Sequence, residues 1–273
     1  MLCLHLGLPK TGTTWLQERI LPKVDGLNVI YKKFMPEFSY AMHRFLLHGE
    51  WQDQIDVPRL CELIESGPSI FTDENVSISM QGIWTGKGFR PDHVAKNIPR
   101  LAAELGDCKI RALVTLRRQD TWLISRYAES AKKRKEPGQE EFEQKVEKVL
   151  LQNSRAKRWL LFDQVHEALT SVCGSDEVLF VCQEQFIQEP EKTVEKVCEF
   201  LGVEVPDTPA LTKTHVNRLS LNERAWRLKS WDDRSVELNA DLSNRIRSHF
   251  EASNRAFSRL SGLDLDVLGY YPS

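Results

Sequence analysis

The sequence predicts a single α/β domain of three layers, in which helices cover both faces of a central parallel sheet. Short apolar runs rich in β-branched residues alternate with longer stretches whose apolar residues recur at helical spacing. The length of 273 residues suits one large domain or two small ones, and no change in composition marks a boundary. We therefore expect residues 1–273 to fold as one domain.

Four apolar runs are expected to be strands, and helical patterns follow them along the chain. The expected strands are Leu2–Gly7, Ser69–Glu74, Lys109–Arg117 and Glu177–Glu184. The expected helices are Thr13–Leu21, which stops at Pro22, and residues 91–106, 120–133, 154–174 and 189–202. The C-terminal third, from about Leu221 to Leu260, is expected to be mainly helical, whereas residues 23–68 carry little recognisable pattern.

Composition narrows the class of protein. A net charge of -2 gives no global attraction to nucleic acid. No apolar run approaches the roughly 20 residues of a membrane-spanning helix, and the N-terminus lacks the basic segment of a signal peptide. The 6 cysteines are scattered without a C-x-x-C pair, which favours buried reduced thiols over disulfides or a metal site. These features predict a cytoplasmic protein without a membrane span or a nucleic-acid partner.

The stretch "GLPKTGTT", from Gly7 to Thr14, is almost a phosphate-binding loop of the form G-x-x-x-x-G-K-[ST]. Thr13 occupies the position of the usual lysine, and Lys10 lies three residues earlier. Such a loop between a strand and a helix presents backbone N–H groups and the positive end of the helix dipole to an anion. A glycine-containing turn with surface threonines is the alternative, but the strand, helix, threonines and lysine together favour anion binding.

The motif "LPKTGTTWL" resembles the 5′-phosphosulfate-binding loop, P-K-x-G-T-T-x-L, of sulfotransferases that use 3′-phosphoadenosine 5′-phosphosulfate (PAPS). The resemblance implies a sulfotransferase fold related to nucleotide kinases. It also implies that the 5′-phosphosulfate is held by Lys10, Thr11, Gly12, Thr13 and Thr14, with Lys10 at the bridging oxygen. By the same resemblance Trp15 lies against the adenine, and the alternative for Trp15 is packing in the core.

The same family binds the 3′-phosphate of PAPS with an arginine at a strand end and a serine eight residues later. In "TLRRQDTWLISRY" these positions are Arg117 and Ser125, and Arg118 is a competing candidate. A basic C-terminal segment closes over this phosphate in the family, which makes Arg218 a further candidate. The alternative for Arg218 is a polar cluster at a helix start. Other stretches, including "SNRAFSRLSGLDLDVLGYYP", resemble bacterial and carbohydrate-type sulfotransferases.

An acceptor hydroxyl needs a base within hydrogen-bond reach. Carbohydrate sulfotransferases often use a glutamate at the end of the second core strand, and the resemblance places Glu74 there. Asp73 would point the other way if the strand continued. "TKTHV", at Thr212–Val216, resembles a catalytic-histidine motif but lies far from the expected position. Three histidines in expected helices are less favoured as the base: His43, His48 and His93.

The sequence is therefore interpreted as a PAPS-dependent sulfotransferase that modifies a hydroxyl of a carbohydrate or related small molecule and needs no metal. Two alternatives remain open at this point. One is a nucleotide or small-molecule kinase with a degenerate loop, which would bind Mg-ATP and which the missing lysine at Thr13 opposes. The other is an adenine-nucleotide-binding module without turnover, which the presence of both Lys10 and Glu74 opposes.

Overall fold

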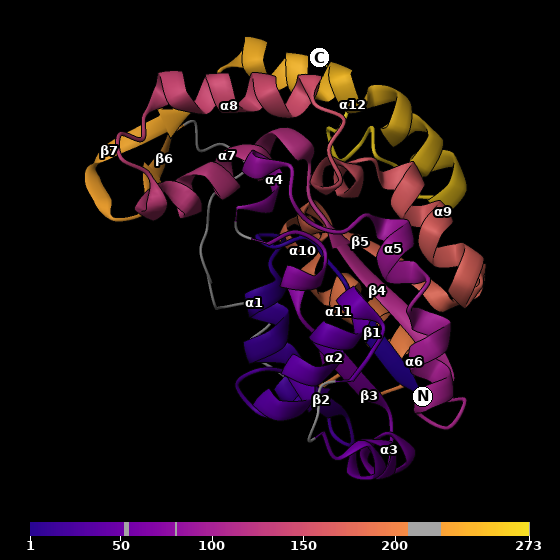
Figure 1. Ribbon diagram of the computed structural model, residues 1–273. Helices are drawn as coiled ribbons and strands as arrows, with labels where there is room; N and C mark the ends of the chain where they lie inside the picture. The colour runs from indigo at the N-terminus through magenta and orange to yellow at the C-terminus, as the bar shows by residue number, and fades with distance from the viewer. Residues whose placement is uncertain (52–54, 80, 207–224, 273) are drawn as a thin grey trace. The chain divides into compact units, whose positions relative to one another are not determined.

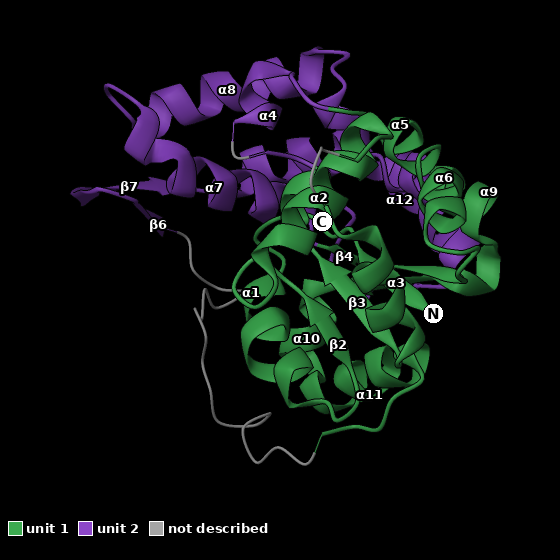
Figure 2. Cartoon of the chain, turned by 60° about the horizontal axis from the view of Figure 1, so that its bottom comes forward, with its two compact units in different colours: residues 1–77, 89–116, 167–214 green, residues 78–88, 117–166, 215–273 purple. Residues whose placement is uncertain are grey.

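The computed structural model describes residues 1–51, 55–79, 81–206 and 225–272 (Figure 1). The chain divides into two compact units, coloured separately in Figure 2. Unit 1 comprises residues 1–77, 89–116 and 167–214, and unit 2 comprises residues 78–88, 117–166 and 215–273.

Unit 1 contains a five-stranded sheet in the order β2-β3-β1-β4-β5, and every neighbouring pair of strands is parallel. The strands are β1 (Leu2–His5), β2 (Asn28–Ile30), β3 (Ser69–Thr72), β4 (Ile110–Leu116) and β5 (Val178–Cys182). β1 and β3 are buried along their whole length and β4 nearly so, because helices cover both faces of the sheet. The predicted fold class is confirmed.

Strand β1 lies at the centre of the sheet, between β3 and β4, and the later strands β2 and β5 form the two edges. Its register aligns His5 with Thr72 on one side and with Leu113 on the other. The carboxyl ends of the three central strands therefore meet at one edge of the sheet. In open parallel sheets this edge, at the point where the strand order reverses, is where ligands bind.

Helices form the outer layers of unit 1 (Figure 1). On one face an apolar cluster joins the sheet to the segment after β1 and to the two helices after β5. These are α1 (Thr13–Trp15), η1 (Leu16–Ile20), η2 (Leu21–Lys23), α10 (Gln183–Gln188) and α11 (Pro190–Leu201). A second group of helices packs around α2, which itself contacts β2 and β3. This group is α2 (Pro36–His48), α5 (Pro91–Ala95) and α6 (Ile98–Glu104), and unit 1 also holds α3 (Val57–Glu65) and short turns at η3 (Glu74–Val76) and η6 (Ser175–Glu177).

Several predicted element boundaries are corrected. The expected helix at Thr13–Leu21 is a short α-helix that continues as a π-helix and ends in a 3₁₀ turn. The expected helix at residues 91–106 is two helices, because Pro99 begins a new first turn in α6. Strand β2 is only three residues long, so the weak pattern of residues 23–68 concealed it.

Unit 2 is mostly helical. Its elements are α4 (Gly82–Thr85), α7 (Gln119–Ser130), η4 (Ala131–Lys133), α8 (Gln139–Leu151), η5 (Ala156–Leu160), β6 (Ala225–Leu228), β7 (Trp231–Glu237) and α12 (Ala240–Ser261). Helix α7 packs against α12 and β6, and α8 packs against α4 and β7. Helix α9 (Phe162–Cys173) is divided between the units: residues 162–166 belong to unit 2 and residues 167–173 to unit 1.

The expectation of a mainly helical C-terminal third is partly wrong, because β6 and β7 form an antiparallel hairpin before α12. Trp226 and Leu228 are buried while their neighbours Ala225 and Arg227 are exposed. This is the two-residue alternation of a strand with one covered face, and four residues are too few to separate it from a helical pattern.

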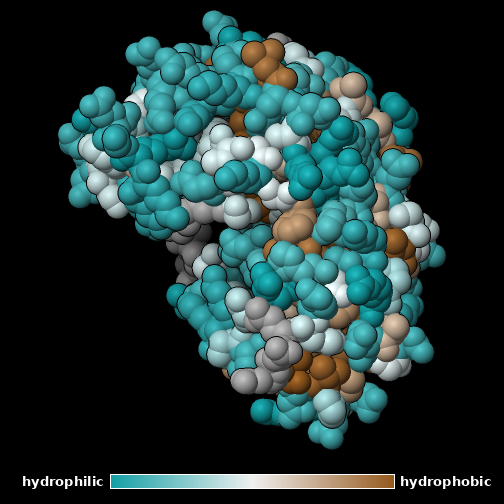
Figure 3. Space-filling model, viewed as in Figure 1, coloured by the Kyte–Doolittle hydropathy of each residue, from teal (hydrophilic) through white to brown (hydrophobic). Residues whose placement is uncertain are grey.

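The surface is predominantly polar on the face shown in Figure 3, where apolar side chains form small separate areas. Within the described ranges, no helix combines the length and the hydropathy needed to cross a bilayer.

Candidate functional site

The loop after β1 departs from ordinary backbone conformations at two positions. Lys10 has a φ of 69° and Gly12 has a φ of 84°, so both lie in the left-handed region. For glycine this costs nothing, but for lysine it is strained, and such strain concentrates at functional sites. The Leu8 N–H still bonds to the Thr115 carbonyl (2.9 Å), so β4 fixes the start of the loop. Thr11 and Thr13 are buried, whereas Thr14 is exposed.

Gly7 lies so close to β4 that no other residue fits without rearrangement. A Cβ atom at this position would lie 1.7 Å from Thr115 Oγ1 and 2.9 Å from the Thr115 backbone nitrogen. The first glycine of the motif is therefore required for close approach of the loop to β4. Gly12 is required for its positive φ.

Buried polar side chains connect the ends of the three central strands. His5 Nδ1 lies 2.8 Å from Thr72 Oγ1, and His5 Nε2 lies 3.2 Å from Thr115 Oγ1. Thr115 Oγ1 in turn lies 2.8 Å from Thr11 Oγ1, within the loop. On the other side, Gln17 Nε2 donates to Thr72 Oγ1 at 2.9 Å. All five side chains are at most 1% exposed, so these hydrogen bonds are shielded from water.

Burial lowers the pKa of His5 to about 4 from the ordinary value of 6.5. Because the unfolded chain binds a proton that the folded protein does not, stability should rise with pH between these two values. We expect the free energy of unfolding to fall by up to about 1.4 kcal/mol per pH unit from pH 6.5 towards pH 4. Urea unfolding of the wild type and of His5→Gln, measured at each pH, checks this. Parallel curves for the two proteins would contradict it.

Glu74 lies just beyond β3, two residues after the strand ends at Thr72. The expected strand through Glu74 is corrected: the Asp73 carboxylate accepts from the Asn75 N–H at 2.9 Å and starts a 3₁₀ turn. Glu74 Oε2 accepts a hydrogen bond from Gln17 Nε2 at 2.9 Å, and the Glu74 side chain is half-buried. Ser77 Oγ lies 3.0 Å from the Gly7 carbonyl and 2.8 Å from the Glu74 carbonyl, which joins this turn to the loop.

Asp73 has different partners from Glu74. Its Oδ2 lies 2.7 Å from Nδ1 of His43, on helix α2. Burial by itself would raise the pKa of Asp73, but the hydrogen bonds from His43 and Asn75 outweigh it and lower this pKa. The three disfavoured histidines are on helices as expected. His48 contacts Arg44, and His93 bonds to the Leu47 carbonyl.

Arg117 directly follows β4, and Ser125 lies on the buried helix α7. Arg117 Nε donates to the Thr121 hydroxyl at 3.1 Å. The competing candidate Arg118 forms an ion pair with the fully buried Asp120 at 2.8 Å. The carboxylate of Asp120 thus compensates the charge of Arg118 within the first turn of α7.

Trp15 is partly exposed and meets Phe186 edge-to-face, with ring centroids 5.7 Å apart, at the margin of the apolar cluster. Trp15 thus packs against the apolar cluster, as the alternative to adenine binding expects, and part of Trp15 stays exposed. Arg218 and the "TKTHV" stretch at Thr212–Val216 lie outside the described residues.

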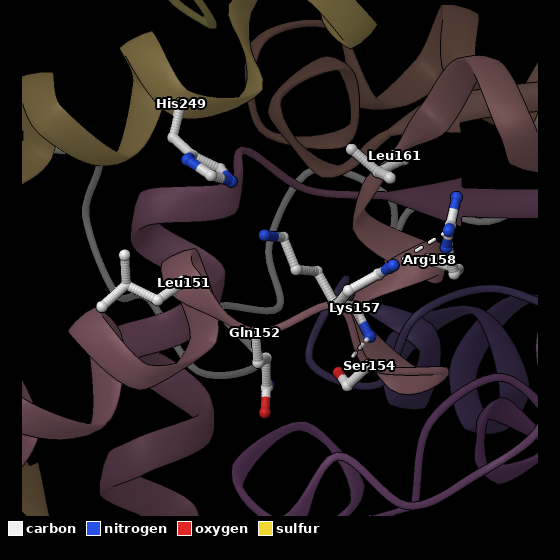
Figure 4. Close-up of a pocket in the computed structure, with 8 residues that line it drawn as sticks. Leu151, Gln152, Ser154, Lys157, Arg158, Leu161 and His249 are labelled. Atoms are coloured by element: carbon white, nitrogen blue, oxygen red, sulfur yellow. Dashed lines mark hydrogen bonds between the residues drawn. The ribbon is translucent and has the colours of Figure 1, made fainter.

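Unit 2 contains a separate pocket of about 230 Å³ between the end of α8, η5 and α12 (Figure 4). Lys157, Arg158 and His249 line it, which makes it basic. Lys157 Nζ donates to the Leu150 carbonyl at 2.6 Å, and Arg158 donates to Gln164 and Asn153. Both cationic groups therefore stabilise the local backbone and side chains of unit 2.

Comparison with known protein families matches residues 3–249 to the sulfotransferase domain. The chain belongs to the sulfotransferase family. A crystal structure of a sulfotransferase from Alicyclobacillus acidocaldarius matches with a TM-score of 0.61 and 16% sequence identity, over 97% of each chain. At this identity the likeness shows the shared fold. No match was found among curated protein sequences.

For this sulfotransferase, the sequence predicts the loop and Glu74 as site residues, and it does not reveal the side chains that connect them: His5, Gln17, Thr72, Ser77 and Thr115. One signal was available. "LCLHLG" places a histidine inside an otherwise apolar strand, where a buried imidazole must find partners. The identity of those partners depends on strand order, which local pattern does not specify.

Proposed function

We propose that this sulfotransferase moves the sulfuryl group of PAPS to a hydroxyl of a carbohydrate or a related small molecule. The observation that carries the proposal is the Gly7–Thr14 loop, with Lys10 and Gly12 at positive φ, at the ligand-binding edge of a sulfotransferase-family sheet. The backbone N–H groups of the loop at the start of α1, together with the strained lysine, fit an anion with several acceptor oxygens. The family match runs through both compact units, which supports one catalytic domain over residues 1–273.

In this proposal each candidate residue has a role. The loop residues Lys10, Thr11, Gly12, Thr13 and Thr14 bind the 5′-phosphosulfate, and Lys10 stabilises the bridging oxygen as the S–O bond breaks. The 3′-phosphate is bound by Arg117 and Ser125, with Arg218 closing over it, and Trp15 lies against the adenine.

Glu74 accepts the proton of the acceptor hydroxyl as its oxygen bonds to sulfur, and 3′-phosphoadenosine 5′-phosphate (PAP) leaves. PAPS supplies the activated sulfuryl group. This group carries less negative charge than a transferred phosphoryl, so the loop and Lys10 suffice without a metal. The free cysteines support a reducing compartment, and we place the protein in the cytoplasm.

Thermal unfolding with PAP, without metal and beside Mg-ATP, tests the donor assignment. At about 100 times its dissociation constant PAP should stabilise the fold by about 2.7 kcal/mol. This corresponds to a rise of several degrees in Tm. Arg117→Ala should reduce the shift, while Arg259→Ala, which removes an exposed charge on α12, should leave it intact. A shift with Mg-ATP alone would refute the donor assignment and favour a kinase.

A further inference from the structure

The buried polar side chains between the loop and Glu74 have a definite order of donors and acceptors. The Leu8 carbonyl can only accept, so the Thr11 hydroxyl must donate its one hydrogen there, at 2.6 Å. The Thr11–Thr115 contact at 2.8 Å then needs Thr115 as donor. With its own hydrogen used, Thr115 must accept from His5 Nε2. The first hydrogen bond thus fixes the direction of the next two.

The same argument continues through the imidazole to Glu74. A neutral imidazole that carries its hydrogen on Nε2 has an acceptor at Nδ1, which takes the hydrogen of the Thr72 hydroxyl. Thr72 Oγ1 accepts from one N–H of Gln17, and the second N–H of Gln17 reaches Glu74 Oε2. Every hydroxyl in the chain therefore donates once and accepts once.

We infer that His5 and Gln17 are positioning residues that hold Glu74 and the anion-binding loop in a fixed mutual arrangement, through a directed hydrogen-bond chain from Gln17 to Leu8. The inference rests on the proposed function for the role of Glu74. The hydrogen-bond chain itself is independent of the proposed function. This hydrogen-bond chain requires His5 to be neutral with its hydrogen on Nε2. Complete burial, which lowers the pKa of His5, keeps the imidazole neutral at pH 7.

The Gln17 amide carries an unsatisfied buried oxygen, which costs free energy and which packing alone does not explain. Its Oε1 is buried and accepts no hydrogen bond from the residues that the structure describes. Turning the amide over would place Oε1 against the Glu74 carboxylate, so its two N–H groups set its orientation. An apolar side chain of similar length would remove the unsatisfied oxygen. The presence of an amide at position 17 is therefore explained by the hydrogen bonds that its N–H groups donate to Thr72 and Glu74.

The tautomer of His5 tests the chain independently of catalysis. Nitrogen-15 NMR of the imidazoles, with His5 assigned by its loss in His5→Gln, should show a neutral ring protonated on Nε2 at pH 7. This spectrum is independent of whether the protein uses PAPS or of which acceptor it modifies. An imidazolium, or a ring protonated on Nδ1, would overturn the chain.

The positioning role of Gln17 is tested with Gln17→Met, which keeps the length of the side chain and removes both donors. PAP release from PAPS, measured with a panel of mono- and disaccharides, should show kcat lower by about 10- to 100-fold. KM for PAPS should stay near the wild-type value, and Tm should fall by only a few degrees, because each of the two lost hydrogen bonds costs about 1 kcal/mol. Gln164→Met is the matched control, because Gln164 contacts Arg158 in unit 2, and it should leave kcat unchanged.

A double-mutant cycle separates failure of this inference from failure of the proposed function. If Gln17 acts through Glu74, adding Gln17→Met to Glu74→Gln should lower kcat by much less than Gln17→Met does alone. Additive effects, or a Gln17→Met variant with lowered Tm and normal kcat, would leave Gln17 a structural residue and overturn the inference. If Glu74→Gln alone leaves kcat unchanged, Glu74 is not the base, and the positioning role of Gln17 is refuted. The nitrogen-15 spectrum of His5 still tests whether the hydrogen-bond chain exists.

Discussion

Glu74→Gln should lower kcat by about 10²- to 10⁴-fold, the contribution that a well-placed general base makes to proton transfer. The amide has nearly the shape of the carboxylate, and its oxygen can still accept from Gln17 Nε2, which lies 2.9 Å from Glu74 Oε2 in the wild type. Packing and donor binding should therefore be preserved. PAP should raise the Tm of the variant as much as that of the wild type.

His43→Asn tests whether Glu74 or the neighbouring His43–Asp73 pair acts as the general base. His43 and Asp73 form a hydrogen-bonded pair at 2.7 Å that could also take a proton. If Glu74 is the base, His43→Asn should leave kcat within about tenfold of the wild type, below the loss that a general base accounts for. A loss of 10²-fold or more in His43→Asn, together with a nearly active Glu74→Gln, would transfer the role to the pair.

Gly7→Ala should be the most destabilising single substitution in the loop. The added Cβ would lie 1.7 Å from Thr115 Oγ1, and Thr115 cannot turn away without breaking its bonds to His5 and Thr11. Overpacking of this kind costs about 1–3 kcal/mol, and each lost buried hydrogen bond adds about 1 kcal/mol. Urea unfolding should show the loss directly, and PAP should no longer raise the Tm.

Gly138→Ala is the matched control for this substitution. Apart from Gly138 itself and its two chain neighbours, no atom of the described residues would lie within 4 Å of a Cβ at this position, and its φ of -177° is open to any residue. Its unfolding free energy should stay within about 0.5 kcal/mol of the wild type. Equal stability of the two alanine variants would show that the loop does not pack against β4 as closely as described.

The parts of the fold that could be predicted from the sequence are those written in local pattern. The long buried strand at Ile110–Leu116 and the helix at Pro190–Leu201, with its proline start and glycine end, needed only their own residues. Strands β2 and β6, with three and four residues, are too short to show a period, and β7 has Val236 as its one buried residue, so no alternation is visible in it. They are strands because of what they pair with.

The candidate site divides in the same way. Lys10, Gly12 and their neighbours form a contiguous motif, and Glu74 follows a recognisable strand, so both could be selected from the sequence. The hydrogen bonds through His5 and Gln17 join residues 55 to 110 positions apart. No spacing rule links them, because their proximity follows from the order of the strands. Only the buried histidine in "LCLHLG" marked that something polar must lie beside it.

The central place of β1 has a consequence for synthesis on the ribosome. His5 bonds to residues 67 and 110 positions later, so β1 emerges from the exit tunnel long before either neighbour in the sheet. At 5–20 residues per second, the nascent chain carries an apolar strand with two open edges for several seconds. Fragments that stop short of Leu116 should therefore aggregate or recruit chaperones, whereas fragments that include β4 can close the centre of the sheet.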